Sequence, residues 1–238
     1  MRKSHIFSKF FYKHFIGDQN KSGQFVDLGN KNPRSSKQLT REWLCDECEK
    51  ILGDSESTVA CELIRMEREQ AYELLNRGKL LHFAVSISWR VMNIEFEIVS
   101  RTLLEQTFPA VKCWRNFLRG NRNNLSYYTN HLFLAPDYKN GMHRTLDRLV
   151  SPDGNIVISF AGPLIIVGLL DSRRFTPGEM EIWKRSEIRP ESSLMKSIDV
   201  WRANQNITLN CLRLMTDRIQ LNAHAVRQMA SELGITKL

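Results

Sequence analysis

The hydrophobic pattern divides the chain into helical and strand-like stretches. Residues 4–16 carry apolar side chains at helical spacings. Residues 62–75 are rich in good helix formers, and Ser55 or Ser57 can cap that helix. Residues 80–104 are hydrophobic on nearly all sides, which predicts a central, buried helix. We expect a shorter helix to follow it, after a break at a proline.

A second group of stretches has the composition of β-strands. Residues 155–160 and 164–170 are rich in β-branched side chains, with a turn signal between them. Strands are also predicted over 125–134 and 180–188. In residues 193–233 the apolar side chains again recur at helical spacing, which predicts a helix. Because helices and strands are segregated, we expect an α+β fold with a small N-terminal module, central helices, a short antiparallel sheet and a long C-terminal helix.

Positive charge is concentrated at the start of the chain. The 238 residues carry a net charge of +8. Residues 1–41 hold nine Lys or Arg and two Asp or Glu, whereas the other 197 residues hold 25 basic and 24 acidic side chains. A hydrophobic content of 42% excludes collagen-like and wholly disordered classes. We therefore expect two units, a basic module over 1–54 and a helical and β domain over 55–238.

A pair of cysteines gives the strongest local chemical signal. Cys45 and Cys48 are separated by two residues, which is the usual half of a tetrahedral zinc site. The remaining donors could come from His5, His14 or the more distant Cys61. The alternative is a reduced cysteine pair without metal. A redox role is less favoured because no βαβ pattern surrounds the pair.

Four segments of the N-terminal half form a recognisable set of motifs. They are Ser4-His5-Ile6 with Lys9-Phe10, Asn32-Pro33-Arg34, Leu44-Cys45-Asp46-Glu47-Cys48-Glu49, and Phe83-Ala84-Val85-Ser86-Ile87-Ser88-Trp89-Arg90. Together they resemble a family of uncharacterised bacterial proteins, and the first part is similar to the HNH, or treble-clef, nucleases. The resemblance covers most of residues 4–120 and implies a small ββα-metal module joined to a helical and β domain.

The resemblance assigns expected roles to individual residues. His5 matches the general base that activates water, and Cys45 and Cys48 match a knuckle that holds structural Zn²⁺. Glu49 stands where active HNH enzymes usually place a metal-binding His, and its carboxylate could bind catalytic Mg²⁺ or Mn²⁺. Ser8 replaces the Pro of the motif, and a first cysteine pair is not present ahead of His5. These departures indicate that the module could also be degenerate.

The leading interpretation is therefore an HNH-like nuclease, or a degenerate nucleic-acid-binding protein, of a bacterial mobile-element or phage-defence type. Clustered cations bind the phosphates of DNA or RNA through counterion release. The first alternative is a non-enzymatic interaction protein with a structural cysteine pair and a protein partner. The second is a membrane-surface protein that uses its amphipathic N-terminal stretch. The residues expected to contact nucleic acid are Arg2, Lys3, Lys9, Lys13, Arg34, Lys37 and Arg41.

Other parts of the sequence qualify this interpretation. The longest apolar run, 156–170, is too short to span a bilayer comfortably, so we expect no transmembrane segment and a cytoplasmic protein. Trp89 is expected in the core, and Arg90 is expected to be buried and paired with a nearby glutamate or a carbonyl group. Arg119 and Arg122 lie in a basic, Asn-rich stretch that could touch phosphate or could simply be solvated.

Overall fold

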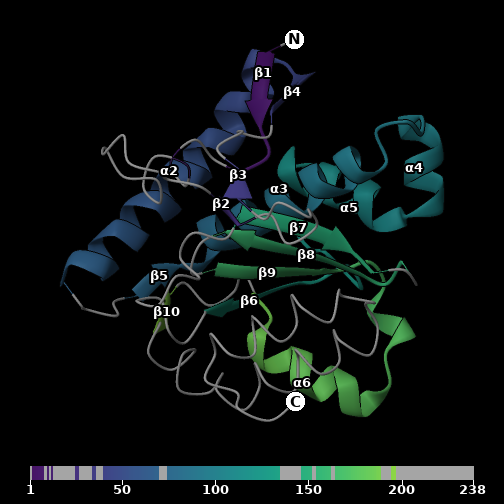
Figure 1. The fold of residues 1–238 in the computed structure, drawn as a ribbon. Helices are drawn as coiled ribbons and strands as arrows, with labels where there is room; N and C mark the ends of the chain where they lie inside the picture. Colours follow the sequence, from purple (N-terminus) through teal and green to yellow (C-terminus); the bar gives the residue numbers. More distant parts are fainter. Residues whose placement is uncertain are drawn as a thin grey trace.

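The structure, a computed structural model, combines helices and antiparallel strands in an α+β fold (Figure 1). A central sheet has α3 and its neighbouring helices on one side and α6 on the other. The residues that the structure describes are 2–7, 10, 12, 25–26, 34–35, 40–69, 74–134, 146–151, 154–161, 164–188 and 194–196.

The central sheet has four antiparallel strands in the order β6-β9-β8-β7. The tight β8–β9 hairpin runs from the pair Ile156 and Leu169 to the pair Ala161 and Leu164. This hairpin confirms the strands predicted over 155–160 and 164–170. The strands are β6 (Asn130–Leu134), β7 (Leu146–Val150), β8 (Ile156–Ala161) and β9 (Leu164–Leu169).

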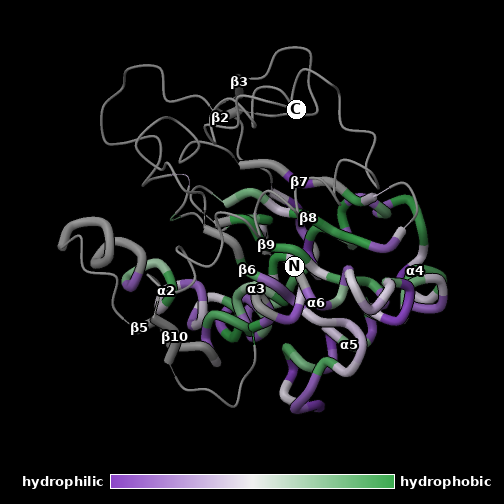
Figure 2. The backbone as a smooth tube through the Cα atoms, turned by 90° about the horizontal axis from the view of Figure 1, so that it is seen from below, coloured by the Kyte–Doolittle hydropathy of each residue, from purple (hydrophilic) through white to green (hydrophobic). Residues whose placement is uncertain are grey.

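Helix α3 (Arg77–Glu95) is the centre of the hydrophobic core, as its sequence predicts. It contacts the strands of the sheet on one side and the helices α2 and α5 on the other. Figure 2 shows hydrophobic residues concentrated along α3 and the sheet. The predicted helix over 80–104 is interrupted, because α3 ends at Glu95 and α4 (Arg101–Thr107) begins after a turn. Within the described part of the chain, no helix is sufficiently long and apolar to cross a membrane.

Two further helix boundaries differ from the sequence prediction. Helix α2 (Asp46–Glu69) begins well before Ser55, because three acidic residues in its first turn stabilise the positive end of the helix dipole. The expected unit boundary after residue 54 therefore falls inside α2. The break at a proline before a shorter helix is confirmed, but Pro109 is itself the first residue of that helix, α5 (Pro109–Leu118), where its missing N–H costs nothing.

The segment predicted as a strand over 180–188 is helical instead. Helix α6 (Pro177–Ser186) starts with a capping box, in which the Thr176 hydroxyl accepts from the Glu179 N–H and the Glu179 carboxylate accepts from the Thr176 N–H. A short 3-10 turn, η3 (Ser172–Arg174), precedes it. Such a cap fixes the start of a helix locally, whatever the composition of the residues that follow.

Three two-stranded sheets complete the described structure. The strands β2 (Phe25–Val26) and β3 (Arg34–Ser35) form a short antiparallel pair. Strand β5 (Leu74–Asn76) pairs with β10 (Leu194–Lys196), so the predicted C-terminal helix over 193–233 is wrong at 194–196. The rest of that prediction lies outside the described residues. The third pair is β1 (Arg2–His5) with β4 (Thr40–Leu44).

A glycine allows α3 and α5 to approach the sheet closely. A Cβ atom on Gly168 of β9 would lie 2.8 Å from Val157 Cγ1, 2.9 Å from Ser88 Oγ and 2.9 Å from Trp114 Cη2. These distances are shorter than normal carbon contacts, so any larger residue would push the layers apart. The glycine thus fixes the position of the two helices that carry part of the candidate site.

Candidate functional site

The antiparallel pair of β1 and β4, which we call the N-terminal hairpin, leads directly into the cysteine pair. Strand β1 pairs with β4 from Arg2 opposite Leu44 to His5 opposite Thr40, and Cys45 follows β4 at the start of α2. His5 is half-buried, and its ring centroid lies 5.8 Å from that of Tyr12. Because a strand rises about 3.3 Å per residue, the five residues from Thr40 to Cys45 separate the His5 end of the strand pair from the knuckle by roughly 16 Å. The pairing alone does not bring His5 beside the thiols.

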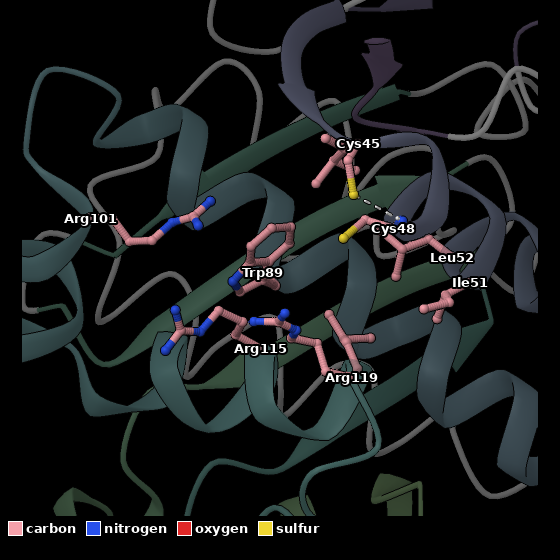
Figure 3. Close-up of a pocket in the computed structure, with 10 residues that line it drawn as sticks. Cys45, Cys48, Ile51, Leu52, Trp89, Arg101, Arg115 and Arg119 are labelled. Atoms are coloured by element: carbon pink, nitrogen blue, oxygen red, sulfur yellow. Dashed lines mark hydrogen bonds between the residues drawn. The ribbon is translucent and has the colours of Figure 1, made fainter. Parts of the chain in front are cut away.

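The two cysteines are in contact and are chemically unequal. The Cys48 N–H donates to Cys45 Sγ at 3.5 Å (Figure 3). This backbone donor, together with the Cys48 side chain, lowers the pKa of Cys45, which is exposed. The side-chain hydrogen bond to Cys45 and partial burial raise the pKa of Cys48. The pair therefore places an exposed thiol with a lowered pKa next to a partly buried thiol with a raised pKa.

The described residues do not complete a metal site around this pair. A structural zinc ion requires four donors, and the pair supplies two. No cluster of three or more His, Cys, Asp or Glu forms within the described ranges. Cys61 lies 13 residues beyond Cys48 on the same helix, roughly 20 Å away at 1.5 Å per residue. Glu49 is half-buried, and its Oε1 lacks a hydrogen-bond partner among the described residues, but one carboxylate does not hold a divalent cation.

The residues expected to contact nucleic acid lie on separate strands, and several lie outside the described residues. Arg2 and Lys3 lie in β1, and Arg34 lies in β3. The exposed Arg41 of β4 pairs with Glu97 just beyond α3, with an Nε–Oε2 distance of 2.7 Å, and this hydrogen bond lowers the pKa of Glu97. The charge of Arg41 is thus partly compensated, and its side chain links the hairpin to the helical core. Outside the described residues lie Lys9, Lys13, Lys37 and the proposed ligand His14.

A pocket of about 290 Å³ opens beside the cysteine pair. It lies where the end of β4 and the first turns of α2 meet α3, α4 and α5 (Figure 3). Five of its lining side chains are apolar or aromatic, and three are arginines. The lining residues are Leu44, Cys45, Cys48, Ile51, Leu52, Trp89, Arg101, Arg115, Leu118 and Arg119. We call this cavity the knuckle pocket.

The three arginines give the knuckle pocket an excess of positive charge. Arg115 pairs with Glu105 at 3.1 Å, but its Nε is buried and has no acceptor among the described residues. Arg101 and Arg119 are exposed, and neither has a carboxylate partner in the described part of the chain. The positive charge of Arg119 acts on the Cys48 thiol, which opposes the rise in its pKa. Among the residues that the structure describes, no acidic side chain lines the pocket.

A buried arginine connects two of the segments that carry the family resemblance. The side chain of Arg90 is 1% exposed, forms an ion pair with Glu56 of α2 and donates from Nη1 to the Ile6 carbonyl at 3.3 Å. The prediction of a buried Arg90 bound to a carbonyl group is confirmed. Its carboxylate partner comes from α2, whereas the nearby candidates Glu95 and Glu97 pair with other arginines. Arg90 thus attaches the end of the hairpin to α3.

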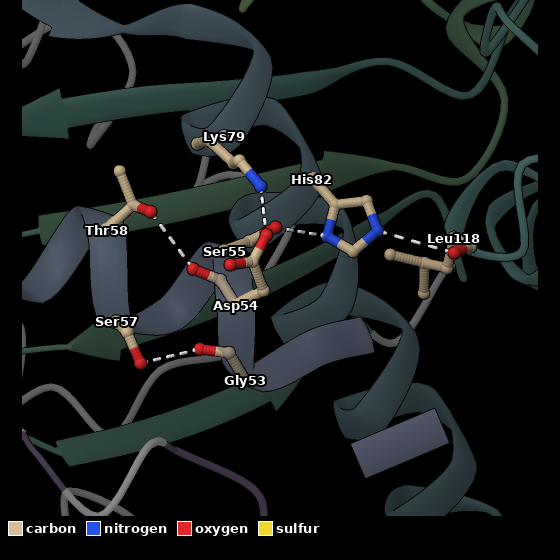
Figure 4. A network of polar contacts seen from close by, with 8 residues as sticks. All are labelled: Gly53, Asp54, Ser55, Ser57, Thr58, Lys79, His82 and Leu118. Atoms are coloured by element: carbon tan, nitrogen blue, oxygen red, sulfur yellow. Dashed lines mark hydrogen bonds and ion pairs between the residues drawn. The ribbon is translucent and has the colours of Figure 1, made fainter. Parts of the chain in front are cut away.

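A second polar network holds the helices around the pocket (Figure 4). A hydrogen bond of 2.8 Å joins Ser55 Oγ to His82 Nδ1, and His82 Nε2 lies 3.4 Å from the Leu118 carbonyl. Burial lowers the pKa of His82. Lys79 of α3 forms an ion pair with Asp54 of α2 on the same side. His82 therefore ties α2, α3 and α5 together as a neutral, structural histidine.

Sequence reasoning predicted part of this site and missed the rest. It identified the cysteine pair and noted Arg119, but it did not associate Arg119 with Arg115 and Arg101. Arg115 and Arg119 are four residues apart, and this spacing places them on one face of α5. Arg122, the other arginine noted in that stretch, instead bonds to Asn124 and Ser126 in its own loop. Trp89 is 5% exposed, as expected for a core residue, yet it also lines the pocket.

Comparison with known proteins adds no further constraint. No family model matches the chain, and searches of the curated proteins and of the solved structures also found no match. The functional conclusion therefore depends on the chemistry of the hairpin, the cysteine pair and the knuckle pocket.

Proposed function

We propose that this protein binds nucleic acid through an HNH-like N-terminal module made of β1, β4 and α2. The observation that carries the proposal is the antiparallel pair of β1 and β4, from which Cys45 leads directly into α2 with Cys48 in its first turn. This is the order of elements expected for a ββα unit. The arginine-lined knuckle pocket at the same junction adds a second site with affinity for phosphate.

Charge supports phosphate binding more strongly than hydrolysis. The first 41 residues hold nine of the 34 basic side chains but two of the 26 acidic ones. Hydrolysis by an HNH mechanism would need His5 next to a bound cation. The hairpin register sets His5 apart from the cysteine pair, and the donors in the described ranges do not complete a metal site. We therefore assign binding to the module and derive no metal-dependent step.

A salt titration tests the binding proposal. Affinity for fluorescently labelled single-stranded and double-stranded oligonucleotides is measured by anisotropy between about 50 and 200 mM salt. If three to five phosphates are contacted, the logarithm of the binding constant should fall with the logarithm of salt at a slope of about −3 to −5. A flat response would overturn the proposal and favour the alternative of a protein-interaction module.

A matched pair of variants locates the contact. The double variant R2Q/K3Q removes two positive charges from β1, and K112Q/K184Q removes two exposed charges from α5 and α6. The first variant should weaken binding and reduce the salt slope by up to about two, whereas the second should change neither quantity. Equal effects of both variants would mean that the net charge, and not the hairpin, governs the binding.

Catalysis and zinc are tested separately on the same protein. Labelled DNA and RNA are incubated with Mg²⁺ or Mn²⁺, and the wild type is compared with His5→Ala. Cleavage that His5→Ala abolishes while binding persists would show an active HNH centre, in contrast to our assignment. Cleavage that is unchanged in His5→Ala would come from another source. Elemental analysis of the purified chain measures whether the cysteine pair carries zinc.

A further inference from the structure

We infer that the knuckle pocket binds one nucleotide, with its base against the apolar wall and its phosphate on the arginines. The choice of ligand rests on the proposed function, but the site itself is distinct from the basic hairpin. The following features of the pocket carry this inference: its size, its apolar wall and its uncompensated charge.

The size and wall of the pocket suit a single flat ring system. Its volume of about 290 Å³ lies near the lower end of the range of about 300–1,000 Å³ that is usual for small-molecule sites. Leu52 of α2 and Trp89 of α3 supply apolar surface (Figure 3), and Leu118 of α5 also lines the pocket. Bases stack favourably on aromatic and apolar side chains regardless of their identity. A second nucleotide or a long acyl chain would extend beyond this space.

The charge of the pocket selects a phosphate. Arg101 of α4 and Arg115 and Arg119 at the end of α5 line it together, and the described lining residues include no carboxylate. Guanidinium groups bind phosphate oxygens in a bidentate manner and are the preferred phosphate ligands in proteins. The buried Nε of Arg115, which lacks an acceptor among the described residues, is a donor that an added oxygen could satisfy.

The cysteine pair sets the opposite end of the pocket. Cys48 is partly buried and lines the cavity, where its sulfur presents a polarizable surface. Cys45, which is exposed, lies at the mouth where α2 begins. A base held between these sulfurs and Trp89 would leave its phosphate on the side of the arginines, as their placement in Figure 3 indicates.

Calorimetry with adenosine monophosphate as the probe tests this inference on the full chain. Binding is expected for the nucleotide, and adenosine without its phosphate should bind much more weakly. The variant R101Q/R119Q should weaken nucleotide binding by at least about tenfold. Both side chains are exposed, so the fold should be retained, and circular dichroism checks this. The control K112Q removes a charge from the same helix, α5, without altering the pocket lining.

The outcomes separate this inference from the proposed function. Absence of nucleotide binding, or unchanged binding in R101Q/R119Q, would overturn the inference, even if R2Q/K3Q still weakens binding to long strands. Nucleotide binding with a flat salt response for long strands would support the pocket and contradict the nucleic-acid proposal. An oligonucleotide with a 5′ phosphate that competes with adenosine monophosphate better than the same oligonucleotide without the phosphate would show that the pocket binds the end of a nucleic-acid strand. Equal competition by the two oligonucleotides would show that the ligand of the pocket is a free nucleotide.

Discussion

Replacing Glu56 with Gln preserves the size of this side chain but removes the negative charge that faces Arg90. The Arg90 side chain is 1% exposed and that of Glu56 is 11% exposed, so water cannot replace the lost partner. Breaking a buried ion pair in this way typically costs about 3–5 kcal/mol, because one charge stays buried and uncompensated. The remaining hydrogen bond from Arg90 to the Ile6 carbonyl places the expected loss near the lower value, about 3 kcal/mol.

Urea unfolding followed by circular dichroism measures this loss. The matched control is Glu97→Gln, which removes the partner of Arg41 from an ion pair whose side chains are 47% and 51% exposed. Exposed pairs contribute at most about 1 kcal/mol, so the control should be nearly neutral. The variant R90M/E56Q should lose less stability than E56Q, because it no longer buries a charge. Equal losses for E56Q and E97Q would refute the claim that Arg90 is desolvated.

Two other predictions follow from the packing and the polar network. Gly168→Ala should destabilise the fold by about 1–3 kcal/mol, because its Cβ would overlap Val157 and Trp114. Gly53→Ala in open space on α2 should be neutral or stabilising by up to about 1 kcal/mol, and thermal unfolding compares the two. Burial lowers the pKa of His82 below its ordinary value of 6.5 in the folded state, so the unfolded chain takes up the proton first as pH falls. The urea midpoint should therefore decrease as pH falls below about 6.5, and His82→Gln should flatten this decrease. Parallel pH profiles for the wild type and His82→Gln would contradict the assignment.

The elements that sequence reasoning predicted correctly are those with a simple pattern. Helix α3 is apolar on nearly all sides, and the β8–β9 hairpin has two β-branched runs around a turn signal, so each pattern indicates one structure. Helix α6 was mistaken for a strand because the residues after Met180 include bulky apolar side chains. The cap formed by Thr176 and Glu179, with Pro177 between them, is the local signal that identifies its start.

The candidate site was less predictable because its residues come from separate elements. Arg101, Arg115 and Arg119 reach the cysteine pair only after α4 and α5 have packed against α3. Likewise, Arg90 has acidic neighbours at positions 95 and 97, but its ion pair is with a glutamate 34 residues away. Sequence proximity indicates partners on one helix, whereas these contacts depend on how the helices are packed.

The contact between Arg90 and the Ile6 carbonyl has a consequence for how the molecule opens. Ile6 and Phe7, which directly follow β1, are fully buried, and Ile6 is held by a charge at the centre of the core. Separating this edge from the rest would expose apolar surface and would also remove one hydrogen-bond acceptor from the buried guanidinium group of Arg90. Local fraying at the amino end is thus suppressed, and backbone amides of the first strand should exchange with solvent on the time scale of global unfolding.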